Sequence, residues 1–248
     1  MELLGLPWFD WLLVPVVFFT AILTAVSGAG GGVLLLGIMG LVLPVAVVVP
    51  VHGAVMVPPN FFRAYLLLRH VDWRFVGIGT LGSVVGALLV APFAVWMPPQ
   101  LMHLLLGLGL LFLVWAPKGR LDFDFPGKVL VLALVTSVVS MLIGAAGILL
   151  SAVRRREGRD KEAVLADQSV LMLVQHSLKA GLLGIMVGSL APYWTLIAVM
   201  AVVGMAGTWV GVNWLRKMDL AWFDKVFKTV VSVVALVQLW QAWHLLVF

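Results

Sequence analysis

The chain has 248 residues, of which 63% are hydrophobic and only 11% are charged, and its mean hydropathy is +1.14. Soluble domains carry about 25% charged residues, so this chain has too few polar side chains to cover a water-soluble surface. The same composition excludes intrinsic disorder, which requires low hydrophobicity. The net charge of +5 lies mostly in loops between apolar runs, which fits membrane orientation better than nucleic-acid binding.

Nearly every apolar run is bounded by charged residues or proline. A bilayer crossing takes about 20 residues, so the chain has room for about eight or nine crossings and no soluble domain. The sequence therefore predicts an all-α, polytopic transmembrane helical bundle. The polar stretches Pro117–Lys128 and Arg154–Glu162 are predicted to be loops, the latter solvated. In chain order the apolar runs are Phe9–Val26, Val33–Val49, Gly53–Leu68, Phe75–Val95, Leu101–Trp115, Val129–Val153, Val164–Val187, Trp194–Leu215 and Val226–Phe248.

Sliding the chain along itself by 116 residues indicates a weak internal repeat. The two copies share, in the same order, a glycine break, an intramembrane cation and a GxxxG motif. This order predicts two membrane repeats of about four segments each, at residues 1–118 and 119–248. The shift aligns Ser27–Gly32 with Ile143–Ile148, Asn60 with His176, and Arg63 with Lys179; after a short gap, Gly82-x-x-x-Gly86 matches Gly207-x-x-x-Gly211.

The distribution of Lys and Arg predicts the topology. The connections at Met97–Gln100 and Gly188–Pro192 carry neither residue. The basic clusters are Arg69/Arg74, Lys118/Arg120/Lys128, Arg154–Lys161 and Arg216/Lys217/Lys225. If the chain reverses at both glycine breaks, every basic loop lies on one side, which the positive-inside rule makes cytoplasmic. A simple crossing at Val129–Val153 would instead separate the basic loops. The reversal gives inverted repeats, as in many secondary transporters, and places both termini outside.

The first candidate site feature is the pair of glycine breaks at membrane depth. Irregular backbone there is tolerated only where it is buried in protein or lines a watery cavity. Half-helices that start after such breaks present free N–H groups, which attract anions. The alternative is that these glycines only allow close helix packing. The candidate residues are Gly28, Gly30, Gly31 and Gly32 in the first half, and Gly144 and Gly147 in the second.

The second feature is intramembrane charge. Arg63 and Lys179 lie inside apolar runs, where a cation is costly unless it faces protein or water. Asp167, near the start of its run, is the only carboxylate in either run, so a bound anion is a suitable counter-charge. The alternative is that the side chains snorkel to the membrane surface. That alternative is strongest for Arg63, which lies six residues before Arg69.

Polar residues accompany each cation at helical spacing. His52 and Arg63 fall on one helix face with Asn60 nearby, and Gln168, Gln175 and Lys179 share a face with His176 adjacent. Each half therefore offers one cation with amide and imidazole groups. The alternative is that these groups only join helices by hydrogen bonds. The two imidazoles are candidates for proton coupling because histidine titrates near neutral pH.

These motifs resemble the sulfite exporter TauE/SafE family of membrane permeases. The resemblance rests on Ser27-Gly-Ala-Gly-Gly-Gly32, Pro44, Val71-Asp72-Trp73-Arg74 and the Gly-rich segment that carries Gly82-Ser-Val-Val-Gly86, with a degenerate copy in the second half. It implies a duplicated four-segment permease that moves sulfite, organosulfonates or related small anions. The second glycine motif is reduced to Gly144-Ala-Ala-Gly147, which departs from the family pattern.

We therefore expect a secondary transporter of small sulfur-containing anions in the inner membrane, working by alternating access between the two halves. The expected substrate site comprises the glycines and polar residues named above. No cofactor, metal, enzymatic activity or nucleic-acid partner is expected, and there is no cysteine for thiolate chemistry. Membrane lipid surrounds the chain, and protons are a candidate coupling ion. A passive anion channel and a non-transporting scaffold subunit remain alternatives, and the oligomeric state, including a homodimer, is open.

Overall fold

The computed structural model describes residues 2–3, 6–27, 30–115, 125–143, 154, 157–188, 190–214 and 220–247. Helices dominate this part of the chain, accompanied by one short hairpin near the N-terminus, in which β1 (Glu2–Leu3) pairs antiparallel with β2 (Leu6–Pro7). The predicted all-α bundle is confirmed. The helices are α1 (Leu13–Ser27), α2 (Gly31–Val42), α3 (Val45–Leu66), α4 (Trp73–Val95), α5 (Pro99–Trp115), α6 (Lys128–Ile143), α8 (Lys161–Leu178), α9 (Gly184–Met186), α10 (Trp194–Trp214) and α11 (Leu220–Val247).

Five helical spans in the described part are long and apolar enough to cross a membrane. They are Trp8–Val26, Trp73–Ala94, Lys161–Met186, Ala191–Asn213 and Lys228–Val247. Large apolar side chains cover the outside, with Trp96 83% and Phe93 72% exposed, whereas Arg63 and Lys179 are buried. This inside-out distribution is that of a multi-pass membrane protein, whose apolar exterior faces lipid.

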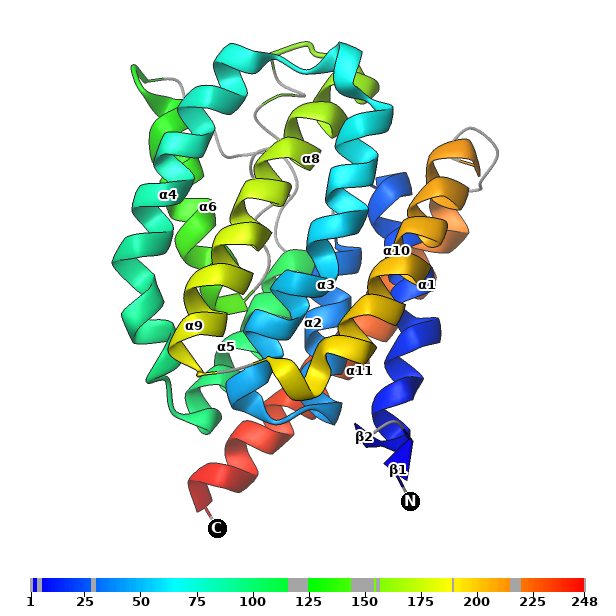
Figure 1. Ribbon diagram of the computed structural model, residues 1–248, viewed down its shortest axis with the longest axis vertical. Coiled ribbons are helices and arrows are strands. Elements are labelled where there is room, and N and C mark those ends of the chain that lie inside the picture. The colour runs from blue at the N-terminus through cyan, green and yellow to red at the C-terminus, as the bar shows by residue number, and fades with distance from the viewer. Residues whose placement is uncertain are drawn as a thin grey trace.

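The first half begins with a helical hairpin. From the end of the molecule that holds both termini, α1 climbs, α2 returns and α3 climbs again (Figure 1). The turn between α1 and α2 is closed by Gly30, whose φ of 100° is strained for other residues. A Cβ on Gly31 would overlap the Thr20 carbonyl oxygen of α1, so the start of α2 must be glycine to pack there. The second break, Gly144 and Gly147, lies outside the described residues, as does Gly28.

One predicted boundary is wrong. The runs Val33–Val49 and Gly53–Leu68 were separated at Pro50, but α3 continues through that proline from Val45 to Leu66. The break falls instead at Pro44, which caps the start of α3 in an extended conformation. Prolines inside membrane helices are tolerated because neighbouring groups satisfy the freed carbonyls. His52 therefore lies well inside α3.

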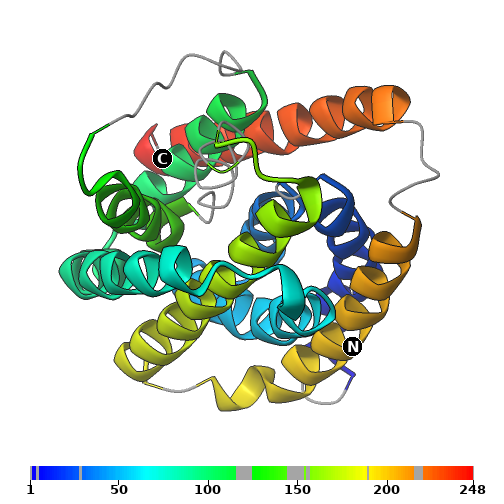
Figure 2. The same cartoon turned by 90° about the horizontal axis from the view of Figure 1, so that it is seen from above.

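Helices of the two halves alternate in their packing. Viewed from above, α3 and α8 cross in the middle, α1 packs on α10 at one side, and α4 packs on α6 at the other (Figure 2). Glycines permit both flanking contacts. A Cβ on Gly82 of α4 would lie 2.3 Å from the Leu130 carbonyl oxygen of α6, and one on Gly207 of α10 would lie 2.4 Å from the Phe18 carbonyl oxygen of α1. Each GxxxG motif thus joins one half to the first helix of the other.

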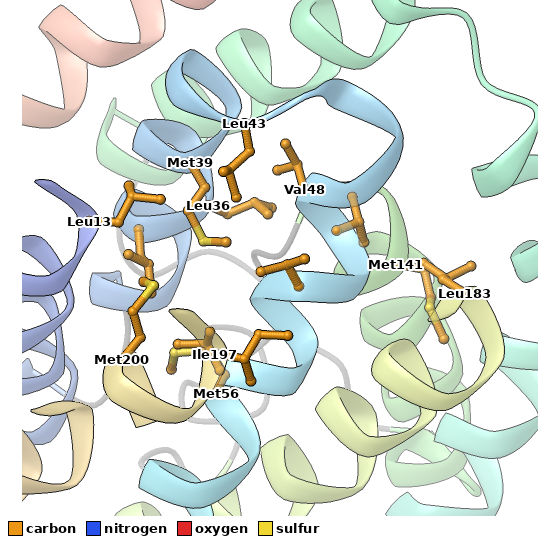
Figure 3. Packing of buried hydrophobic residues seen from close by; sticks show 14 of the residues in the cluster. Leu13, Leu36, Met39, Leu43, Val48, Met56, Met141, Leu183, Ile197 and Met200 are labelled. Carbon is orange, nitrogen blue, oxygen red and sulfur yellow. The ribbon is translucent and has the colours of Figure 1, made fainter. Parts of the chain in front are cut away.

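The largest apolar core fills the end of the bundle that holds the termini. It gathers side chains from the start of α1, the end of α2 and the start of α3, with others from the last turns of the α8–α9 helix and the first turns of α10 (Figure 3). Leu183 and Val48 lie about one turn from Lys179 and His52, respectively, on this side. The labelled members are Leu13, Leu36, Met39, Leu43, Val48, Met56, Met141, Leu183, Ile197 and Met200.

We predict that Gly82→Ala destabilises the protein, because the added Cβ must push α4 away from α6. Overpacking of this kind typically costs about 1–3 kcal/mol. Gly77→Ala is the matched control on the same helix, since its Cβ meets nothing within 4 Å. Thermal unfolding of the detergent-solubilised variants measures the difference. Equal unfolding temperatures for the two variants would refute the close contact between α4 and α6.

Candidate functional site

The centre of the molecule is the antiparallel crossing of α3 and α8. A Cβ on Gly53 would lie 2.9 Å from the Ala180 backbone nitrogen and 3.1 Å from the His176 carbonyl oxygen. Further along, Arg63 of α3 contacts Ser169 of α8. Because Gly53 has no side chain, the backbones of α3 and α8 can touch. Polar residues of both halves therefore meet along the contact between these two helices.

Lys179 lies at this crossing and is fully buried. Its ammonium nitrogen Nζ has no hydrogen-bond acceptor among the residues that the structure describes. Lys179 also begins a π-helical stretch, Lys179–Leu183, and such wide turns occur frequently at functional sites. A buried ammonium without an acceptor is costly, so this position calls for an anionic or polar guest.

Two histidines lie beside Lys179. The rings of His52 and His176 have centroids 5.3 Å apart at an interplanar angle of 67°. His52 Nε2 donates to the Gly32 carbonyl oxygen at 2.7 Å, because a carbonyl can only accept. Its Nδ1 is then an acceptor, and it has no donor within the described part of the chain. The bond to Gly32 brings the first turn of α2 to the α3–α8 crossing.

Arg63 makes a different, well-satisfied set of contacts. Its Nε donates to Ser169 Oγ at 2.6 Å, its Nη1 to the Thr24 carbonyl oxygen at 3.1 Å, and its Nη2 to Asn60 Oδ1 at 2.9 Å. Asn60 in turn donates to the Met56 carbonyl oxygen at 2.7 Å. Arg63 is only 2% exposed and its contacts point inward, which excludes the snorkelling alternative. The guanidinium thus ties α1, α3 and α8 together.

Arg63 and Lys179 face each other from opposite ends of the α3–α8 crossing. Arg63 and Gly53, where Lys179 packs, are ten residues apart on α3, or about 15 Å along the axis. Helical side chains lean toward the N-terminus of their own helix. Because α3 and α8 are antiparallel, Arg63 and Lys179 lean toward each other. His176 is close enough to both for their charges to act on it.

No carboxylate pairs with either cation in the described ranges. Asp167, the acidic residue of the same run, is occupied by Arg154, with Nη2–Oδ2 at 2.6 Å. The segment 144–153 contains no Asp or Glu at all. The prediction of a solvated loop at Arg154–Glu162 is wrong at both ends, because Arg154 is 5% exposed and α8 begins at Lys161. That arginine is held by carboxylates that local composition could not reveal.

The two buried glutamines of α8 differ in what the structure shows of their contacts. Gln175 donates to Ser83 Oγ at 3.0 Å and to Thr136 Oγ1 at 3.3 Å, which places it against α4 and α6. Gln168 is buried, and its Oε1 has no donor in the part of the chain described. The structure thus brings His52, His176 and Lys179 together, groups Asn60 with Arg63, and sets Gln175 apart.

Sequence reasoning missed the hydroxyl groups around the site. Ser169 accepts from Arg63, and Ser140 on α6 is buried with no partner among the described residues. The shift of 116 residues contains the missing signal, since it aligns Ser169 with Gly53 and Ser140 with Thr24. Three of these four residues contact a cation of the site. The Ser169 hydroxyl and the Thr24 carbonyl accept from Arg63, and Gly53 lies against Lys179.

Comparison with known proteins gives one match. The family model described as sulfite exporter TauE/SafE matches residues 13–237, nearly the whole chain. No curated protein and no solved structure matches the chain significantly.

We predict opposite effects on stability from removing the two cations. Arg63→Met leaves three buried acceptors without their charged donor and should cost about 3 kcal/mol or more. Lys179→Met, of similar length, removes a buried charge without stranding any acceptor, so stability in anion-free buffer should be unchanged or higher. Thermal unfolding of both variants measures this contrast. A marked loss of stability in Lys179→Met would show that Nζ has a protein partner.

Proposed function

Because the chain belongs to the sulfite exporter TauE/SafE family of membrane transporters, we propose that it is a secondary transporter of small sulfur oxyanions, sulfite or organosulfonates. Lys179 carries the proposal. Its ammonium is buried at the centre of the bundle, and neither a carboxylate nor another acceptor pairs with it among the described residues. A bound oxyanion supplies both the missing charge and the missing acceptors.

Each residue of the site has a distinct proposed role. Lys179 provides the principal charge, and Arg63 adds a second positive field from the other side of the crossing. Asn60, Gln168, His52 and His176 orient the anion, and Gln175 supports this part of α8 through its bonds to α4 and α6. The backbone N–H groups at the start of α2, from Gly30 to Gly32, contribute the positive end of a helix dipole. Gly28, Gly144 and Gly147 complete the proposed pair of glycine breaks.

The electrostatics favour anions of small size. A site flanked by two fixed cations rejects metal ions and protonated amines by repulsion. Pyramidal or tetrahedral sulfur oxyanions present several oxygen acceptors at once, which suits one ammonium and several neutral donors. The edge-to-face pair of His52 and His176 makes protons the candidate coupling ion, since a neutral imidazole acceptor beside a bound anion can take up a proton.

Alternating access between two inverted repeats, 1–118 and 119–248, is the proposed mechanism. The reciprocal packing of α1 on α10 and of α4 on α6 supports it, because helices at matching places in the two repeats make matching contacts. The proposed location is the inner membrane, with the basic loops cytoplasmic and both termini outside.

We predict that purified protein in liposomes gives saturable sulfite flux that organosulfonates inhibit and simple carboxylates inhibit weakly. Lys179→Met should abolish both flux and sulfite-induced thermal stabilisation, because the anion loses its counter-charge. Lys161→Met is the matched control, since Lys161 is exposed at the start of the same helix. Uptake of labelled sulfite, with and without a proton gradient, measures the activity.

The outcomes separate the alternatives. Flux that no gradient can drive uphill would assign a passive anion channel instead of a carrier. Unchanged flux in Lys179→Met would remove the proposed site, and absence of flux for every anion tested would leave the scaffold alternative.

A further inference from the structure

A network of ion pairs lies at the end of the bundle opposite the termini. Arg154 Nη2 contacts Asp72 Oδ2 at 2.9 Å and Asp167 Oδ2 at 2.6 Å, and Arg154 Nη1 contacts Glu157 Oε2 at 2.7 Å. Lys128 Nζ extends the network to Glu157 Oε1 at 3.1 Å. The Arg154 guanidinium also stacks on the Phe75 ring, 4.1 Å from its centroid. Three carboxylates therefore share one arginine, and Lys128 joins the network through Glu157.

This network connects the two halves of the chain. Asp72 lies in the connection between α3 and α4 and caps α4 by accepting from the Arg74 and Phe75 backbone N–H groups. Asp167 lies on α8, and it also accepts from the Asp72 backbone N–H at 2.7 Å. The α3–α4 connection is thus fastened to α8 by a carboxylate, a backbone amide and an arginine together.

The network lies directly above the substrate site. From this end, α8 presents Asp167 first, then Ser169 with Arg63, then His176 and Lys179. Twelve residues separate Asp167 from Lys179, or about 18 Å along the helix. An anion that moves between Lys179 and this end of the molecule must pass the level of the network.

Asp72 and Glu157, which lie outside the candidate membrane spans, are held ionised. The Phe75 backbone N–H lowers the pKa of Asp72, and Arg154 adds to this effect against an opposing contribution from burial. Burial raises the pKa of Glu157, but hydrogen bonds from Arg154 and Lys128 outweigh it and the net pKa is lowered. Since both pKa values are below their usual range, the ion pairs persist at neutral pH and weaken only when the pH falls through those values.

The opposite end closes by different chemistry. Apolar side chains such as Val48 and Leu183 fill the space one turn beyond His52 and Lys179. Apolar packing loses its stabilisation when water enters, whereas separated ion pairs regain hydration. Asp72 is the partly exposed member of the network, so its carboxylate can regain water when it separates from Arg154.

We propose that Asp72, Arg154 and Asp167 form an ionic gate, which closes the path between the Lys179 site and the basic-loop end of the molecule and separates when the site opens to that side. This inference rests on the proposed transport function. Opening moves the α3–α4 connection and Asp72 away from α8, and the half-buried Asp72 exchanges its arginine for water. Arg154 stays with Asp167 and Glu157, which belong to its own half.

Site-directed labelling can test the gate without measuring transport. The chain has no cysteine, so Ser169→Cys introduces a single thiol below the network. A membrane-impermeant maleimide is added from the basic-loop side to protein in oriented vesicles. Asp72→Asn should raise the labelling rate on the order of tenfold, since it weakens a hydrogen bond between charged groups. Labelling from the opposite side should not rise.

The matched control is Arg74→Gln, an exposed neighbour of Asp72 whose side chain makes no described contact with the network. Its labelling rate should equal that of the parent. Arg154→Gln is the second gate variant, used if Asp72→Asn does not purify as a monodisperse protein. Equal labelling in both gate variants and the parent would overturn the gate. A rise from both sides would also overturn it, because it would indicate general loosening. Faster one-sided labelling without sulfite flux would retain the gate and reject the substrate assignment.

Discussion

The central constraint on this protein is the buried charge of Lys179, which lies where the backbones of α3 and α8 touch. Gly53 lets α3 approach α8 closely beside Lys179, whose side chain is fully buried. A charge in that position needs a partner, and the described residues supply none, while the segment 144–153 contains no acid. An isolated buried charge is costly, so this position is suited to an anion or polar group that binds beside Lys179.

Arg63 shows the contrast within the same site. Three acceptors from α1, α3 and α8 surround its guanidinium, so this cation holds helices together as well as adding positive potential. The aligned positions in the two halves thus have unequal tasks, one structural and electrostatic, the other receptive. This inequality would give the anion a defined primary partner in Lys179, with the Arg63 field fixing which part of the cavity is most positive.

The two ends of the bundle are closed by different kinds of contact. Beyond Lys179 on one side the bundle is filled by the apolar core, and on the other side it is fastened by Arg154 and its carboxylates. A carrier must open each end in turn, and the ionic end is better suited to repeated opening because its groups are stable in water as well as in the pair. Close packing of α4 on α6 and of α1 on α10, which glycines permit, joins the two halves on both sides of the α3–α8 crossing.

Much of this could be predicted from the sequence, because membrane helices, intramembrane cations and glycine breaks are properties of local composition and spacing. Helical spacing put His176 beside Lys179 and His52 on the face of Arg63, but it left the inward position of Arg63 open and could not show that His52 lies next to His176. The burial of Arg154 could not be predicted, since a run of charges looks solvated until the fold brings Asp72 and Asp167 to it. Likewise, spacing placed Gln175 on the lysine face but could not show that α4 and α6 would take its amide.

The most direct test of the central claim is a crystal structure with selenite, an analogue of sulfite whose selenium gives an anomalous signal. We predict one anomalous peak at the α3–α8 crossing, within hydrogen-bond distance of Lys179 Nζ, and the loss of this peak in Lys179→Met. A selenite peak only elsewhere, or a wild-type crossing that stays empty at saturating selenite, would contradict the assignment of Lys179 as the anion's principal partner.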